Sequence, residues 1–105
     1  MDILKEFENW LITTKKKKNG NTMSKSSAYK YARAVHTISE EILKIRAIDD
    51  SLFNISSISE LEREIKCIKE NNDFNIKNDT GRNMYSVALE YYLDFMRNRL
   101  LQYLN

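Results

Sequence analysis

The sequence predicts an all-α fold, a compact four-helix domain in which the C-terminal helix is central. Proline is absent, and glycine occurs only at positions 20 and 81. Lysine, glutamate, leucine and isoleucine are abundant, and together with the scarcity of helix breakers this composition indicates helices. Apolar residues make up 42% of the 105 residues, enough to bury a core, and charged residues make up 30%. We therefore expect residues 1–105 to form one soluble domain.

The first helix is predicted over residues 2–13. Asp2 suits the N-cap, and Glu6 and Glu8 suit the first turns of a helix. The apolar residues recur at spacings of three and four and form one stripe: Ile3, Leu4, Phe7, Trp10 and Leu11. Residues 14–25 are predicted to form a loop because they lack this periodicity and contain an Asn-Gly-Asn turn signal.

The second helix is predicted over residues 25–47, with Ser24, Ser26 or Ser27 as its cap. Its inward stripe consists of Ala28, Tyr31, Ala32, Val35, Ile38, Ile42 and Ile45. A different face carries hydroxyl and basic groups at helical spacing: Ser26, Lys30, Arg33 and Thr37. That second face is expected to point outward and to form a local positive strip.

A short turn and a third helix are predicted to follow. Leu52, Phe53 and Ile55 are expected to plug the core, and a helix is expected over residues 59–70. Ser59 and Glu62 fit the Ser-x-x-Glu capping box. Within that helix the residues expected to face inward are Leu61, Ile65 and Ile68.

The last third of the chain is predicted to be a polar loop and a long helix. The loop covers residues 71–81, with Phe74 and Ile76 as its anchors, and the helix covers residues 82–104. Apolar residues occupy more than one face of this helix: Tyr85, Ala88, Leu89, Tyr92, Leu93, Phe95, Met96, Leu100, Tyr103 and Leu104. Such a helix is either central in its bundle or leaves a face for a partner.

Positive charge is concentrated in one segment. The chain carries a net charge of only +2, yet residues 13–46 hold nine lysines and arginines against two glutamates, a local charge of +7. A concentrated field of this kind favours an anionic partner, either nucleic acid or an acidic protein surface.

Two parts of this segment are candidate DNA contacts. The run Lys15, Lys16, Lys17 and Lys18 is either a phosphate grip or a solvated loop. Lys30 and Arg33, with Ser26 and Thr37 as hydroxyl donors, form the better candidate surface, bordered by Lys25 and Tyr29.

No catalytic, cofactor or metal site is predicted. His36 is the only histidine and is expected to pair with Glu40 one turn away. Cys67 is interpreted as a partly buried structural thiol because no general base can be assigned to it. Tyr92 is assigned to the core, Tyr91 is left open between core and base stacking, and the acidic residues are too scattered for a metal or carboxylate pair.

Arginines near the C-terminus are a weaker candidate for the basic surface. Arg82, Arg97 and Arg99 would extend it, although Asp94 is placed to neutralise Arg97. A single cysteine precludes an internal disulfide and suits a reducing cytoplasm. The apolar stretches are short and interrupted by charge, so no membrane span or secretory signal is expected.

Three segments resemble a family of small helical domains. Residues 6–11 with 26–40 are similar to the helical domain at the N-terminus of McrB-type restriction ATPases and HNH-type restriction endonucleases. Residues 81–96 resemble the closing helix of that domain, typically Gly-Asn-x-Met-Tyr-Ser-x-Ala-Leu-x-x-Tyr-x-x-Phe-Leu. A looser similarity, on the Ser-x-x-x-Tyr start of the second helix, is to the core-binding domain of tyrosine recombinases.

The restriction-type resemblance implies a DNA-contacting or targeting module of a restriction or defence system, fused to an effector. This chain shows no nuclease motif and no nucleotide-binding loop. We therefore expect a non-catalytic DNA-binding module that uses residues 15–18 and the second helix. The alternative is a protein-interaction module, such as a small inhibitor of a host or phage nuclease, that binds an effector or a second copy through the basic strip or the last helix.

Overall fold

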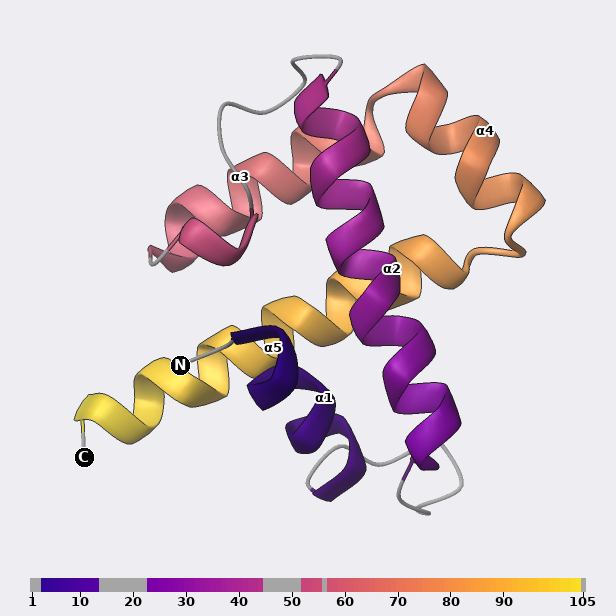
Figure 1. The fold of residues 1–105 in the computed structure, drawn as a ribbon. Helices are drawn as coiled ribbons and strands as arrows, with labels where there is room; N and C mark the ends of the chain where they lie inside the picture. Colours follow the sequence, from indigo (N-terminus) through magenta and orange to yellow (C-terminus); the bar gives the residue numbers. More distant parts are fainter. Residues whose placement is uncertain (1–2, 14–22, 45–51, 56, 105) are drawn as a thin grey trace.

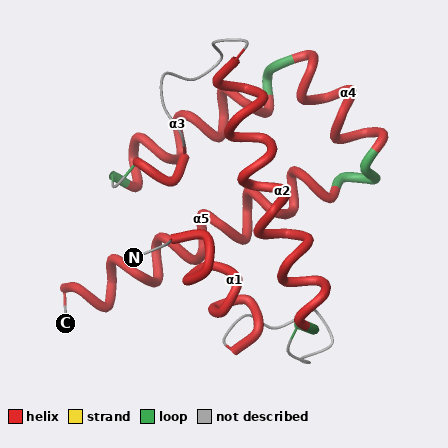
Figure 2. Tube along the Cα trace, in the orientation of Figure 1, coloured by secondary structure: helices red, strands yellow, loops and turns green. Residues whose placement is uncertain are grey.

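A computed structural model describes residues 3–13, 23–44, 52–55 and 57–104, and it confirms the all-α prediction. The elements in chain order are α1 (Ile3–Thr13), α2 (Lys25–Lys44), the short 3-10 helix η1 (Leu52–Asn54), α3 (Ile58–Lys69), α4 (Asn72–Thr80) and α5 (Met84–Leu104). Figure 2 shows helices and short loops, and no strand, in this described part of the chain. The radius of gyration is 13.4 Å, about the value for a compact domain of this length.

Helix α5 is the central element, as its sequence predicts. It runs across the molecule and is crossed by α2, and α1 and α3 lie on opposite sides of α5 (Figure 1). It contacts α1, α2, α3 and α4, and its contact with α2 is the most extensive in the molecule. The physical reason is its distribution of apolar residues, since a helix with apolar groups around its circumference must be covered on several sides.

The core lies where α1, α2 and α3 meet α5. The predicted inward residues Phe7, Leu11, Ala28, Ala32, Val35, Ile38, Leu61, Ile65, Ile68, Leu89 and Tyr92 are all buried. The Phe7 ring packs 5.2 Å from Tyr92 and 5.4 Å from Phe95, measured between ring centroids. Trp10 lies 5.7 Å from Phe95, so an aromatic cluster joins α1 to α5.

Element η1 closes the core, as predicted. Leu52 is fully buried, and Phe53 and Ile55 pack against the core. The backbone N–H of Leu52 donates to the hydroxyl of Ser39 (2.9 Å), and the Tyr92 hydroxyl donates to the Leu52 carbonyl (3.4 Å). Side chains from α2 and α5 thus satisfy the buried backbone of this turn.

The predicted loop over residues 71–81 is wrong, because most of it is the helix α4. Asn71 is the N-cap, and its side chain accepts a hydrogen bond from the Phe74 N–H (3.0 Å). Asparagine and aspartate favour turns and helix N-caps alike, so a segment rich in both indicates either structure. Phe74 is a buried anchor as predicted, but Ile76 is 67% exposed.

Several boundaries differ from the prediction. Helix α3 begins at Ile58 with Ser57 as its N-cap, which accepts from the Glu60 N–H (3.4 Å), rather than with Ser59. Two overlapping Ser-x-x-Glu patterns occur here, and the earlier one adds Ile58 to the buried stripe. Helix α5 begins at Met84 rather than residue 82, after Arg82 and Asn83 adopt φ values of 54° and 67°.

Among the three predicted caps of α2, Ser24 is the one that accepts from a helical N–H, that of Ser27 (3.2 Å). The predicted cap Asp2, the loop residues 14–22 and the predicted end of the second helix at residues 45–47 lie outside the described residues.

Candidate nucleic-acid interface

An open hollow of about 390 Å³ lies between the outward face of α2 and the first turn of α5. Both helices are seen in Figure 1, where α2 crosses α5. The residues that line the hollow are Ser26, Tyr29, Lys30, Arg33, Ala34, Thr37, Met84 and Tyr85. The hollow therefore contains the four residues of the predicted α2 face together with four further residues.

Helical spacing explains why α2 presents these groups to solvent. The core side of α2 buries Ala28, Ala32 and Val35, so residues offset from that stripe point away from the core. Ser26, Lys30 and Arg33 are exposed, and Thr37 is half-buried. The hydroxyl and basic side chains consequently form the rim of the hollow.

The floor of the hollow is apolar and is fixed by packing. Ala34 is only 4% exposed, and Met84 and Tyr85 are half-buried against the core. A Cβ atom added at Gly81 would lie 2.8 Å from Cε2 of Tyr85. A larger residue at position 81 would therefore force the Tyr85 ring to move. The backbone does not itself require glycine there, because the φ of Gly81 is −85°, which any residue can adopt.

Two aromatic rings beside the hollow carry cations. The guanidinium carbon of Arg33 lies 5.5 Å from the ring centroid of Tyr29, which is 53% exposed. Nζ of Lys77 lies 5.0 Å from the ring centroid of Tyr85 and 3.2 Å from Glu41 Oε1. Burial acts to lower the pKa of Lys77, but the hydrogen bond and charge of Glu41 outweigh it and the pKa is raised.

Among the described residues, the two cations on the rim have no carboxylate within ion-pair distance, unlike Lys69, Arg97 and Arg99. Lys69 pairs with Glu90, Arg97 with Glu62 (2.8 Å), and Arg99 with Glu6 (3.0 Å). The hydrogen bond that Arg97 donates to the Glu62 carboxylate is the main cause of the raised pKa of Arg97. Within the described part of the chain, no carboxylate forms an ion pair with the two rim cations, Lys30 and Arg33.

The other predicted DNA contacts are Lys25 and the run of four lysines before it. Lys25 is exposed in the first turn of α2 but does not line the hollow. Lys15, Lys16, Lys17 and Lys18 lie outside the described residues. Sequence reasoning missed Met84 and Tyr85 as site residues and assigned Tyr85 to the core alone. They are distant from α2 along the chain, so no local pattern links them to it.

Of the remaining candidates, His36, Tyr91 and Tyr92 make contacts within the fold, and Cys67 is exposed. His36 Nε2 lies 3.2 Å from Glu40 Oε1, which confirms the predicted pair. Tyr91 packs edge-on against Tyr31, with ring centroids 5.2 Å apart, and the Tyr92 side chain is fully buried. Cys67 is exposed, so its interpretation as a partly buried thiol is wrong; it follows Lys66 on the solvent side of α3.

Two of the three C-terminal arginines, Arg97 and Arg99, are paired with carboxylates and so add little to the basic face. Arg97 lies 3.8 Å from Asp94, as predicted, in addition to its ion pair with Glu62. Arg82 is exposed in the turn before α5.

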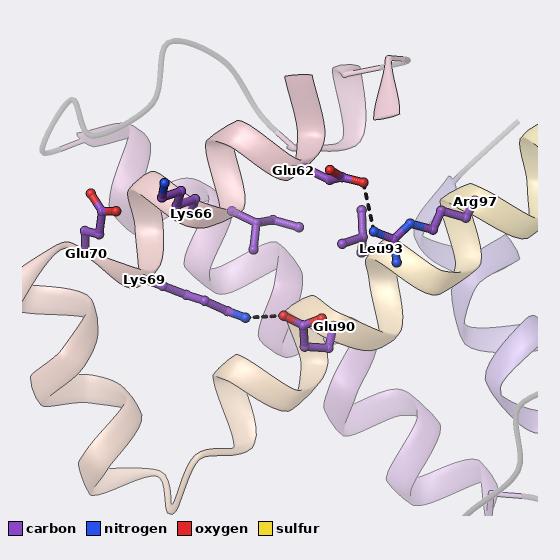
Figure 3. A pocket seen from close by; sticks show the side chains of 8 residues that line it. Glu62, Lys66, Lys69, Glu70, Glu90, Leu93 and Arg97 are labelled. Atoms are coloured by element: carbon purple, nitrogen blue, oxygen red, sulfur yellow. Dashed lines mark hydrogen bonds and ion pairs between the residues drawn. The ribbon is translucent and has the colours of Figure 1, made fainter. Parts of the chain in front are cut away.

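A second hollow, of about 450 Å³, lies between α3 and α5 and is a weaker candidate (Figure 3). Its Lys69 and Arg97 point at Glu90 and Glu62 across the gap and are neutralised by them. A ligand would have to replace these ion pairs, whereas the α2 hollow offers cations without such partners.

No other ligand chemistry is evident in the part of the chain that the structure describes. No group of three or more histidine, cysteine, aspartate or glutamate residues there is arranged to hold a metal ion. No described helix is long and apolar enough to cross a membrane. Comparison with protein-family models, curated proteins and solved structures found no match, so the case for a function depends on the α2 hollow itself.

Proposed function

We propose that this protein is a non-catalytic DNA-binding module that contacts phosphates through the outward face of α2. The observation that carries the proposal is the pair of cations on the rim, Lys30 and Arg33, which lack an acidic partner among the described residues. Cations that already have carboxylate partners gain less from phosphate, because the existing ion pair must first be broken.

The surroundings of the two cations suit a phosphate backbone. Ser26 and Thr37 add hydroxyl donors at the same rim, and Lys25 adds a further exposed charge in the first turn of α2. The first turn of α5 also borders the hollow. Binding would release counterions from the DNA and would therefore weaken steeply with salt.

Targeting within a restriction or defence system is part of this proposal and is supported by the resemblance of residues 6–11, 26–40 and 81–96 to restriction-type helical domains. In that arrangement the module holds an effector near DNA and itself performs no chemistry.

Fluorescence anisotropy of labelled DNA across a salt series tests the proposal. The double variant Lys30→Glu/Arg33→Glu should bind on the order of tenfold or more weakly at low salt. It should also make the slope of log affinity against log salt less steep by about 2, because each of the two replaced cations would neutralise one phosphate.

The matched control is Lys5→Glu/Lys66→Glu, which changes the net charge equally at exposed positions on α1 and α3. This control should retain the wild-type salt slope, because neither lysine lines the α2 hollow. Equal weakening by both variants would show that only net charge matters, and absence of binding by the wild type at low salt would contradict the proposal.

A protein-interaction function is the second candidate, and one observation favours it. The start of α3 and the C-terminal part of α5 together present an apolar surface formed by Ile58, Leu100 and Leu101 beside Arg97, and Leu101 is 59% exposed. Association of two copies through this surface would bury Leu101. Sedimentation velocity should then show a dimer that the Leu101→Glu variant abolishes, with no effect of Lys30→Glu/Arg33→Glu.

A further inference from the structure

We propose that the α2 hollow receives an unstacked nucleobase, so that the protein prefers single-stranded or locally unpaired DNA to an intact duplex. The proposal rests on the proposed DNA-binding function and specifies which form of DNA the same site takes. Its basis is the combination of an exposed aromatic ring, an apolar floor and a cationic rim within one hollow.

The exposed ring belongs to Tyr29. It is the one aromatic residue among the exposed large apolar residues of the described chain, and it lines the hollow. Aromatic rings of this size are normally buried, as Tyr92 is here. Arg33 lies over the Tyr29 ring, so the two side chains form a platform of ring and guanidinium. Bases stack on both kinds of group, and this stacking depends little on sequence.

The hollow also has the size and lining for a base. Its volume of about 390 Å³ falls within the range of about 300–1,000 Å³ typical of small-molecule sites. Ala34, Met84 and Tyr85 supply apolar surface for the base faces. The hydroxyls of Ser26 and Thr37 can donate or accept hydrogen bonds at a base edge.

The phosphates would lie outside the hollow, at its rim. Lys30 is exposed there, and Lys25 is exposed five residues earlier, in the first turn of α2. A base in an intact duplex is stacked on both faces and would have to be extruded to enter the hollow, at the cost of unstacking and unpairing. A single strand avoids most of that cost, which is the origin of the expected preference.

The test compares three labelled probes of equal phosphate number: an oligothymidine, the same strand with abasic sites throughout, and a duplex. The intact protein should bind oligothymidine about tenfold more tightly than either of the other two at the same salt concentration. Tyr29→Ala should remove most of the advantage of oligothymidine over the abasic strand. Because Tyr29 carries no charge, this variant should leave the salt slope unchanged.

Two further variants serve as controls. Tyr29→Phe keeps the ring and should keep the preference for oligothymidine. Leu101→Ala shortens another exposed apolar side chain, far from the hollow on α5, and should change nothing.

The possible results distinguish failure of the base site from failure of DNA binding itself. Equal affinity for oligothymidine and the abasic strand, with binding of both abolished in Lys30→Glu/Arg33→Glu, would overturn the base site and leave phosphate binding intact. A preference for oligothymidine that Tyr29→Ala does not reduce would also overturn it, since the base would then contact another surface. Tighter binding of the duplex would overturn the strand preference, and no binding of any probe would overturn both proposals.

Discussion

At the scale of single residues, Ser39 is a buried polar side chain that holds the η1 turn against the core. It is 1% exposed, and its hydroxyl accepts the backbone N–H of Leu52. Ser39→Ala would leave that buried N–H without its partner, which costs about 1–3 kcal/mol. Urea unfolding followed by the fluorescence of Trp10 should show this decrease in stability, whereas Ser86→Ala, which removes a hydrogen bond on the surface, should cost less.

Tyr92 makes the stability of the protein sensitive to alkaline pH. Burial raises the pKa of its phenol above the ordinary 10.0, an effect that Arg99 partly opposes. The neutral phenol is therefore favoured in the folded state, so its contribution is complete below pH 10 and is lost as the pH rises above 10.

The Tyr92→Phe variant isolates this contribution. The difference in unfolding free energy between wild type and variant should be constant up to about pH 10 and then fall by about 1.4 kcal/mol per pH unit. Urea titrations of both proteins between about pH 8 and 11 measure it. A difference that stays flat at higher pH would show that the phenol ionises equally in both states.

At the scale of elements, the junction between α4 and α5 is held by a side chain from the preceding helix. Oδ1 of Asn78 accepts the N–H of Ser86 (3.0 Å) in the first turn of α5. Asn78 thus acts as a cap from α4, although it is eight residues distant in sequence. Its Nδ2 also lies 3.4 Å from Oδ1 of Asn83, a residue with positive φ.

Replacement of Asn78 should therefore weaken the start of α5. Asn78→Ala is expected to cost about 1 kcal/mol, the typical effect of removing an N-cap, measured as a lower urea midpoint. Asn75→Ala, an exposed position on the same helix, is the control and should lie within about 0.5 kcal/mol of wild type. Equal effects of the two substitutions would contradict the capping role.

The elements also show how far the sequence predicts this structure. The buried stripe of α2 and the central place of α5 follow from the spacing of apolar residues, and both are confirmed. Helix α4 is not predicted from the sequence because it buries only Phe74. It therefore lacks the apolar stripe by which a helix is recognised. The outward direction of Lys30 and Arg33 follows from α2 alone. The floor of the hollow cannot be predicted from the sequence of α2, because Tyr85 belongs to α5 and its approach to α2 depends on Gly81.

At the scale of the whole molecule, α5 is the element that joins the other helices into one core. It contacts each of the other four α-helices, so a chain that ends at residue 83 would keep the packing of α1 on α2 but lose the helix that joins this pair to α3 and α4. We expect such a truncated chain to lose much of its helix by circular dichroism and to show no cooperative urea transition. Removal of the α4 anchor alone, by Phe74→Ala, should lower stability by about 3–5 kcal/mol and leave a cooperative transition if enough stability remains.

The ion pair between Glu6 and Arg99 has a consequence for how the molecule is made. These two residues are 93 positions apart, and Figure 1 shows α1 beside the C-terminal half of α5. During translation, α1 and α2 can pack against each other first, but they can dock on α5 only after residues 84–104 have left the ribosome, so the shared core forms late in the synthesis of this segment. Until α5 is available, Phe7 and Trp10 cannot pack against it and are accessible to chaperones. The rate at which the chain between α1 and α5 closes into a loop sets how long this exposure lasts.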